Sequence, residues 1–393
     1  MNFSLLEEAR ALEATAIADR RYIHQHAEIG TDLPVTKDYV MSRLTAMGYA
    51  PKEICPSGIV AEIGQSGPTI LLRADMDALP MQEKSGLSFA SLTENAHTCG
   101  HDIHAATLLA AAQLLKNHES ELKGTVKLMF QPAEETISGA ALMVEAGVLE
   151  SPKVDAAVAM HVSSMHQSGV VYYRPGDIYA SSDGFAITLY GKGGHGASPN
   201  HCIDPINMAA QLYIALQPLI SREKDPAKQA VLTIGAIHGG TANNIIPETV
   251  EMLGTLRCYD PEVRQMLKRR IVEMANSVTA MFGGRAEVTF FNKTPAMFAD
   301  EALTAEVAQC LAETLPAEHV DLFPMIFSGS EDFAEVATRV PATMLILGCA
   351  VNDPEGIYMH HHPKVVFDES AMVYGAAAYA GAALGWLNKH ADK

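Results

Sequence analysis

The stretch Thr69-Ile-Leu-Leu-Arg-Ala-Asp-Met-Asp77 joins an apolar, strand-forming run to two acidic residues. Side chains alternate along an extended chain, so Asp75 and Asp77 are expected to point to the same side. Open α/β sheets bind their ligands beyond the carboxyl ends of parallel strands. The stretch therefore predicts a strand at 69–72 that leads into a binding site, although a polar turn after a strand would have a similar sequence.

Apolar strands and helices alternate on both sides of this stretch. Strands are expected at 59–63, 125–130 and 154–160, and helices at 4–29, 36–47, 104–115 and 138–146. This alternation predicts a mostly parallel sheet with helices on both faces. The uncharged run 370–388 is rich in Ala and Gly and is expected to be a buried helix, because a membrane span needs about 20 strongly apolar residues.

The segment 183–292 follows a different order of elements. Strands and helices are expected there in the order βαββαβ, a ferredoxin-like unit, with Asp204 and Asp260 capping the two helices. The elements expected after it, at 301–315, 331–337 and 343–347, return to the α/β style. The sequence therefore predicts an α/β domain, residues 1–182 and 293–393, that is split by an inserted domain at 183–292.

The charge and cysteine content narrow the functional classes. With 46 acidic and 28 basic residues, the formal net charge is −18, which disfavours nucleic acid and anionic membranes as partners but not an anionic small substrate. The six cysteines form no C-x-x-C pair and indicate free thiols in a reducing compartment. Glutamates within 1–21 favour an amphipathic helix over a signal peptide, so the cytoplasm is the expected location.

Four further clusters carry residues that suit metal chemistry. They are Cys99-Gly-His101-Asp102, Glu134 with Glu135, His161, and His360-His361-His362. Taken singly, each has an ordinary structural explanation, such as a helix cap, an acidic first turn, a packed histidine or an exposed loop. Most of them follow a strand or open a helix, so one edge of the fold can collect them. Cys, His, Glu and Asp together suit two divalent ions roughly 3.5–4 Å apart.

Together these motifs resemble the aminoacylase, hippurate hydrolase and indole-acetyl-amino-acid hydrolase family of dinuclear metallopeptidases. The resemblance rests on ordered stretches at 21–30, 73–80, 99–104, 131–135, 191–197, 239–247, 329–333 and 361–363. It implies two divalent ions, zinc or manganese with nickel or cobalt as alternatives, bound by Cys99, His101, Glu135, His161 and His361. It also implies that Glu134 is the catalytic base and that Asp75 and Asp77 support the ligands from behind, a role that Asp102 also suits.

The same resemblance assigns the inserted domain to a lid and to dimerisation. It implies that His195 reaches the active site of a neighbouring subunit and that Asn244 and Arg257 bind a substrate carboxylate. The implied reaction is hydrolysis of the amide bond of an N-acyl amino acid by a homodimer. Thr136 and Ile137 stand where the family often has glycines after the Glu pair, and the residues from 292 to 338 contain no arginine. The acyl group and the amino acid therefore stay open.

Three other functions remain alternatives at this point. Carboxypeptidase or dipeptidase action on small peptides would use the same metals. Cys99 could instead act as a thiol nucleophile with His101, but this would leave Glu135 and His161 without a role. A metal-binding or scaffold dimer without catalysis would have no need for Glu134 as a base.

Overall fold

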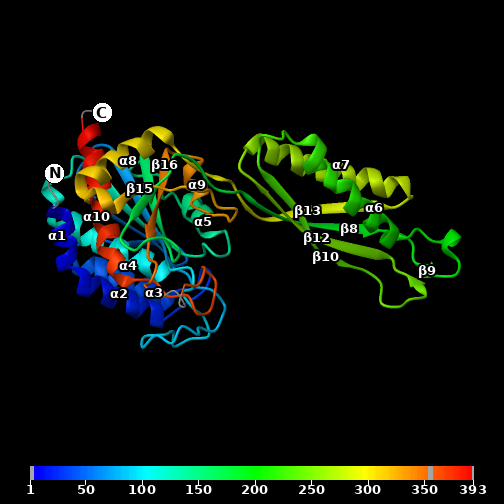
Figure 1. Cartoon of the computed structure of the whole chain (residues 1–393), viewed down its shortest axis with the longest axis horizontal. Helices are drawn as coiled ribbons and strands as arrows, with labels where there is room; N and C mark the ends of the chain where they lie inside the picture. Colours follow the sequence, from blue (N-terminus) through cyan, green and yellow to red (C-terminus); the bar gives the residue numbers. More distant parts are fainter. Residues whose placement is uncertain (1–3, 353–356, 392–393) are drawn as a thin grey trace. The chain divides into compact units, whose positions relative to one another are not determined.

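The structure, a computed structural model, describes residues 4–352 and 357–391 and separates into two compact units. The first unit comprises Met1–Ile178, Phe298–Met325 and Asp332–Lys393, and the second comprises Tyr179–Met297 and Ile326–Glu331. Figure 1 shows the elements of each unit coloured along the sequence. The second unit is thus inserted into the first, with a short return at Ile326–Glu331.

The first unit is built on a mixed eight-stranded sheet in the order β1-β2-β4-β3-β5-β16-β6-β15. Its strands are β1 (Lys52–Cys55), β2 (Gly58–Gly64), β3 (Thr69–Asp75), β4 (Thr125–Gln131), β5 (Ala156–Ser163), β6 (Val171–Tyr173), β15 (Val320–Leu322) and β16 (Ala342–Gly348). The four central strands, β4, β3, β5 and β16, run parallel, whereas β2 and β6 are antiparallel to their inner neighbours. The predicted α/β class with a mostly parallel sheet is confirmed.

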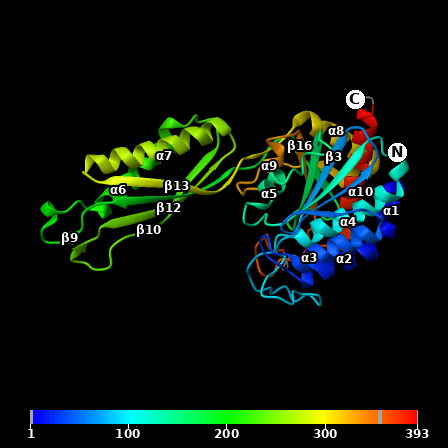
Figure 2. The same cartoon turned by 180° about the vertical axis from the view of Figure 1, so that it is seen from behind.

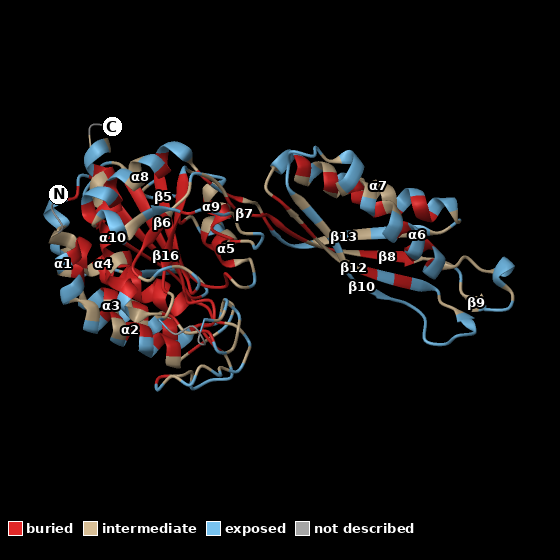
Figure 3. Cartoon of the chain, viewed as in Figure 1, coloured by how far each residue is buried: buried red, intermediate tan, exposed pale blue. Residues whose placement is uncertain are grey.

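Helices lie on both faces of this sheet (Figures 1 and 2). They are α1 (Ser4–Ala11), α2 (Glu13–Gln25), α3 (Pro34–Ala46), α4 (His101–Asn117), α5 (Gly139–Glu145), α8 (Glu301–Thr314), α9 (Ala334–Ala337) and α10 (Met372–His390). Figure 3 shows that α4 and α10 are largely buried. The small side chains of α10 let its backbone approach α8, because a Cβ atom on Gly381 would lie 2.1 Å from Thr314 Oγ1. Among the described residues, no helix is long and apolar enough to cross a membrane.

The structure corrects three of the predicted elements. The single helix expected at 4–29 is divided at Leu12, whose N–H bonds to the Ala9 carbonyl in a tighter i to i−3 turn. The helix expected at 331–337 is reduced to α9. The strand that was expected to end at 160 continues to Ser163, so His161 lies within β5, opposite Ile346 of β16, and not after the strand. This extension depends on pairing with β16, which is distant in the sequence.

The second unit contains a four-stranded antiparallel sheet in the order β10-β12-β8-β13. Its elements are β8 (Ser182–Tyr190), α6 (Pro205–Pro218), β10 (Ala230–His238), β12 (Thr249–Cys258), α7 (Pro261–Met281) and β13 (Arg285–Thr294). The side chains of Asp204 and Asp260 each accept hydrogen bonds from two backbone N–H groups at the start of α6 and α7. Both helices share one core with alternate residues of β8. This βαββαβ order confirms the ferredoxin-like prediction.

Two short antiparallel strands, β9 (Gly194–His195) and β11 (Ile245–Ile246), pair with each other in the second unit. The remaining strands, β7 (Gly176–Tyr179) and β14 (Met297–Ala299), span the points where the chain passes between the units. All six cysteines are free, as the sequence predicted.

The close approach of α10 to α8 yields a testable prediction. The Gly381→Ala variant is expected to lose about 1–3 kcal/mol in the free energy of unfolding, because the added methyl group forces the two helices apart. Gly235→Ala is the matched control, since nothing lies within 4 Å of a Cβ atom at that position. Denaturant unfolding of the three proteins measures the difference. Equal midpoints for Gly381→Ala and Gly235→Ala would contradict the packing described here.

Candidate metal centre

Potential metal-ligand atoms converge in the first unit at the carboxyl ends of the parallel strands. Within each of three overlapping groups, the atoms lie within 4.8 Å of one another. The groups are Cys99–His101–His161, Cys99–Glu135–His361 and His101–Glu134–Glu135. The structure thus brings together the five residues expected as ligands, and it places Glu134 beside them.

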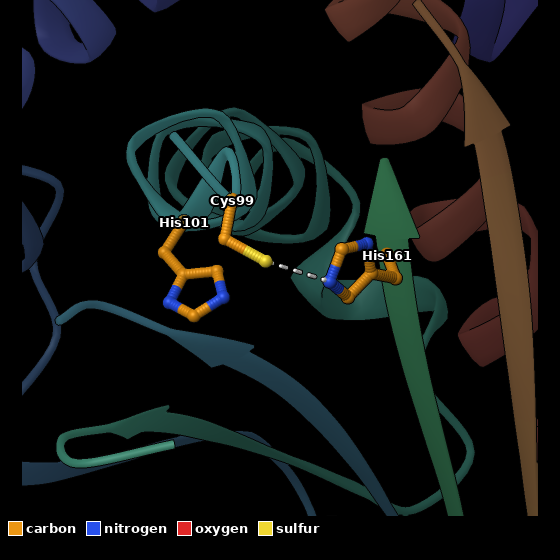
Figure 4. A group of neighbouring side chains, drawn as sticks. All are labelled: Cys99, His101 and His161. Carbon is orange, nitrogen blue, oxygen red and sulfur yellow. Dashed lines mark hydrogen bonds between the residues drawn. The ribbon is translucent and has the colours of Figure 1, made fainter. Parts of the chain in front are cut away.

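Cys99 and His101 are held at the start of α4, and His161 faces them from β5 (Figure 4). The distance from Cys99 Sγ to His161 Nε2 is 3.5 Å. Gly100 between the first two has φ +93°, and a Cβ atom there would lie 2.4 Å from Val162 Cγ2. Both the left-handed backbone and the lack of space require glycine, which allows the cysteine and the histidine to face the same point.

The orientation of the imidazole rings suits metal binding. His161 Nδ1 donates to the Val162 carbonyl at 2.7 Å, and His101 Nδ1 donates to the Asp77 carbonyl at 2.8 Å. In the neutral form of both rings, Nε2 therefore carries a lone pair that points towards the group, as in known metal sites. His101 Nε2 and Glu135 Oε1 are buried, and neither hydrogen bonds to any residue in the described part of the chain. A buried imidazole nitrogen and a buried carboxylate oxygen that lack hydrogen bonds to the described residues and lie 3.9 Å apart fit a bound cation.

The loop that follows β4 presents both glutamates to this point. The Asp77 carboxylate accepts the backbone N–H of Glu134 at 2.9 Å and that of Glu135 at 3.1 Å. Ala133 and Ile137 have φ values of +56° and +55°, so the loop contains two strained left-handed residues. Glu134 Oε2 and Glu135 Oε1 lie 4.0 and 3.9 Å from His101 Nε2. Asp77 therefore sets the position of both carboxylates.

The three consecutive histidines near the C-terminus point in different directions. His361 has φ +64°, and its Nε2 lies 3.4 Å from Glu135 Oε1. Its backbone N–H donates to the Thr98 carbonyl at 3.0 Å, which joins this loop to the one that carries Cys99. His362 stacks on Tyr358 with ring centroids 4.2 Å apart, and His360 stacks on His161. Of the three, His361 alone enters a group of candidate ligands among the described residues.

Asp75 lies behind the ligands in a fully buried network. Its carboxylate pairs with Arg73 Nη1 at 2.9 Å and accepts the Nδ1 proton of His104. His104 Nε2 accepts the backbone N–H of Val162 at 2.8 Å, which fixes the ring as the neutral Nδ1–H tautomer. Burial opposes ionisation of Asp75, but Arg73 and His101 hold the pKa of its carboxyl well below the ordinary value. An anionic carboxylate is thus maintained next to His101.

Burial and charge perturb the pKa values of the expected ligands themselves. Burial raises the pKa of the Cys99 thiol well above 9 and lowers the pKa of His161 well below 6.5. Burial also opposes a charge on His101, but Asp75 raises the pKa of that ring. For Glu135, burial is outweighed by His361 and His101, which lower its pKa. Such clustered perturbations are typical of functional sites.

Asp102 turns away from the ligand group and belongs to a second buried network. Its Oδ2 accepts from Arg20 Nε and from His24 Nδ1, each at 2.8 Å. His24 Nε2 lies 3.1 Å from Glu83 Oε2, so both ring nitrogens of His24 can donate. Although burial opposes the charge, Asp102 raises the pKa of His24 to about 9. This imidazolium ties the loop around Glu83 to the first turn of α4.

Sequence reasoning named Asp102 but missed its partners Arg20, His24 and Glu83. Polar residues on a helix and in a loop far from Asp102 in the sequence have no local pattern that marks them as a cluster. Arg20 and His24 lie on or beside one of the stretches that carry the family resemblance, which is the one signal that could have drawn attention to them.

The residues expected to contact substrate from the lid lie in the second unit. His195 is exposed on β9, and the Gly196 N–H donates to the Asn244 carbonyl at 2.8 Å, so these two segments are neighbours. Arg257 lies on β12, and its guanidinium donates to Thr255 Oγ1 and to the Leu256 carbonyl. Burial lowers the pKa of Arg257. The roles of His195, Asn244 and Arg257 towards a substrate stay predictions.

Comparison with known proteins agrees with this geometry. The sequence model of peptidase family M20/M25/M40 matches residues 71–385 of this chain. N-acetyl-L-cysteine deacetylase of Bacillus subtilis is 37% identical over 92% of this chain and 86% of its own length. Thermostable carboxypeptidase 1 of Saccharolobus solfataricus is 36% identical over 98% of both chains. IAA-amino acid hydrolase ILR1-like 4 of Arabidopsis thaliana is 37% identical over 94% of this chain and 84% of its own.

A solved structure with the same architecture is the YXEP protein of Bacillus subtilis, described as a dinuclear metal-binding peptidase of family M20. It superposes with a TM-score of 0.84 at 32% identity, and the match covers 96% of this chain and 99% of that one. The chain belongs to peptidase family M20/M25/M40 and is a metal-dependent amidohydrolase. The family resemblance inferred from the sequence is confirmed.

The His24 network yields a prediction about pH. The pKa of His24 is about 9 in the folded protein and 6.5 in its ordinary state, so its stabilising effect is complete below pH 6.5 and is lost as the pH rises through 9. The free energy of unfolding of the wild type should therefore exceed that of His24→Gln by a margin that shrinks from pH 6.5 to 9. Chemical denaturation across this range measures it. A difference in unfolding free energy that does not change with pH would contradict a charged His24. Glu83→Gln should lower the pKa of His24 and so narrow the pH range over which this difference is lost.

Proposed function

We propose that this chain hydrolyses the amide bond of small N-acyl amino acids, with release of a carboxylic acid and a free amino acid. The observation that carries the proposal is the convergence of Cys99, His101, Glu135, His161 and His361 with Glu134 beside them. The names of two relatives, a deacetylase of N-acetyl-L-cysteine and a hydrolase of IAA-amino acids, support an N-acyl amino acid as the substrate class.

Cys99, His101, Glu135, His161 and His361 are proposed to hold two divalent ions in each subunit. The family resemblance implies zinc or manganese, with nickel and cobalt as alternatives. Among these, a set of one thiolate, three imidazoles and one carboxylate best suits zinc. Bound ions would supply a Lewis acid for the amide carbonyl and would lower the pKa of a water molecule. The buried lone pairs of His101 Nε2 and Glu135 Oε1 support this assignment.

Glu134 is proposed as the general base and, later, the general acid. Its carboxylate takes a proton from the attacking water as the new C–O bond forms. It then gives this proton to the amide nitrogen as the C–N bond breaks, so that the amine leaves in neutral form. The hydrogen bond from the Glu134 N–H to Asp77 supports this role, because it fixes the stretch of backbone that carries the carboxylate.

The second unit is proposed to complete the substrate site within a cytoplasmic homodimer. Arg257 and Asn244 are assigned to the carboxylate of the amino-acid product, for which a guanidinium is well suited. His195, supplied by the partner protomer, is assigned to the oxyanion that develops on the amide. The exposure of His195 on β9 is compatible with reaching another protomer.

Carboxypeptidase action is the second candidate, and the similarity to thermostable carboxypeptidase 1 supports it. A thiol hydrolase is less well supported, because burial raises the pKa of Cys99 and so disfavours the reactive thiolate in the absence of metal. A scaffold without catalysis would not require a buried carboxylate at Glu134.

Replacement of Glu134 tests the proposed base. Glu134→Gln is expected to lower kcat by roughly 10²–10⁴-fold or more without loss of bound metal, because the amide cannot take a proton from water. Glu145→Gln, an exposed position on α5, is the matched control and should keep wild-type activity. Metal content by mass spectrometry and turnover of an N-acetyl amino acid give the two readouts. Turnover by Glu134→Gln at the wild-type rate would refute the assignment.

A substrate panel with and without a chelator tests the reaction class. N-acetyl and N-benzoyl amino acids are expected to be cleaved faster than dipeptides of the same amino acids. Incubation with EDTA should abolish activity, and zinc or manganese should restore it, because the site depends on bound cations. Faster cleavage of dipeptides would favour the carboxypeptidase alternative. Activity that survives EDTA would exclude the metal mechanism and would favour Cys99 as a thiol nucleophile.

A further inference from the structure

His360 immediately precedes the proposed ligand His361, yet its ring occupies a different place in the site. The ring is partly buried and lies parallel to His161, with centroids 5.2 Å apart and an interplanar angle of 18°. Its other neighbour is Phe367, whose ring meets it edge-on at 5.4 Å. The His360 ring thus packs between the rings of His161 and Phe367, on the same side of the site as Cys99.

Hydrogen bonds decide which nitrogen of His360 carries the proton. Its Nε2 accepts the backbone N–H of Ser164 at 3.2 Å, so in the neutral ring the proton must lie on Nδ1. Nδ1 lies 3.9 Å from Cys99 Sγ, at the long end of hydrogen bonds to sulfur. A hydrogen bond from Ser164 Oγ to the Tyr358 carbonyl at 2.8 Å fixes the two loops that set this geometry.

His161 also faces the Cys99 sulfur, but it presents a lone pair where His360 presents an N–H. Because its Nδ1 donates to the Val162 carbonyl, its Nε2 offers a lone pair to Cys99 at 3.5 Å. The one proton of the neutral His161 ring is used in that bond, so this ring has no N–H to donate to the sulfur, whereas the neutral His360 ring has its N–H on Nδ1. In the described part of the chain, His360 itself enters no group of candidate ligands.

We infer that His360 is a positioning residue that donates an N–H···S hydrogen bond to the Cys99 thiolate and tunes its bond to the metal. The inference rests on the proposed function, in which Cys99 is a ligand. A donor to a ligating sulfur withdraws negative charge from it, and such partners outside the ligand set control both affinity and electronic properties. The bond also offsets the repulsion between the thiolate and the nearby carboxylate of Glu135.

The experiment uses the full-length protein loaded with cobalt(II), whose thiolate-to-metal charge-transfer absorption reports on the Cys99 sulfur. His360→Phe keeps an aromatic ring for stacking on His161 but removes the donor. Its charge-transfer band should move to longer wavelength, and chelator competition should show about 10-fold weaker metal binding. His360→Asn retains an N–H donor near the Nδ1 position and should keep the band close to that of the wild type.

His362→Phe is the matched control, because His362 stacks on Tyr358 instead of facing the site, and it should leave the band unchanged. A His360→Phe band at the wild-type wavelength, or a His360→Asn band shifted as far as that of His360→Phe, would overturn the inference. A wild-type protein without any thiolate-to-cobalt band would instead remove Cys99 from the ligand set, and with it the proposed metal site. The two failures are therefore distinguishable.

Discussion

The site depends on Asp77, which joins three parts of the first unit at one point. Its carboxylate accepts the backbone N–H groups of Glu134 and Glu135, and its carbonyl accepts the Nδ1 proton of His101. Asp77, just beyond the end of β3, therefore fixes both the loop that follows β4 and the imidazole of His101, the first residue of α4. Because the loop contains left-handed residues, it would relax to another conformation without such bonds.

A network of buried charged and polar side chains supports this arrangement. Arg73 pairs with Asp75, and its Nε donates to Gln131 Oε1 at 2.8 Å. Asp332 then accepts from the Gln131 amide at 2.6 Å and from the Ala140 N–H at 2.9 Å, where α5 begins. Breaking a buried pair of this kind typically costs about 3–5 kcal/mol, so these charges are tolerated only with all partners in place. The network links both ends of the loop that carries Glu134 to the sheet.

The local sequence predicted the fold class and the residues that gather at the sheet edge, and physical reasons explain why. The run from Thr69 to Asp77 combines an apolar strand with acids at its end, and strand ends of this kind meet at one edge. The caps Asp204 and Asp260 were visible because capping acts over three residues. The choice of His361 from three consecutive histidines came from family resemblance and not from local chemistry.

Features that depend on distant partners could not be predicted in this way. The extension of β5 through His161 needs β16 as a neighbour, and the charge on His24 needs both Asp102 and Glu83. The direction in which the His360 ring points is set by Ser164 and Phe367, from two separate loops. Residues that tune the site are therefore less visible in sequence than those that would bind the metal.

Anomalous diffraction from crystals of the protein grown with zinc or manganese would test the central claim most directly. The account predicts two peaks inside the group formed by Cys99, His101, Glu135, His161 and His361, with zinc about 2.3 Å from sulfur and about 2.0–2.1 Å from imidazole nitrogen. Two peaks within this group of side chains would establish the dimetal centre. Peaks bound elsewhere, or a His161 or His361 ring turned away from any peak, would contradict it.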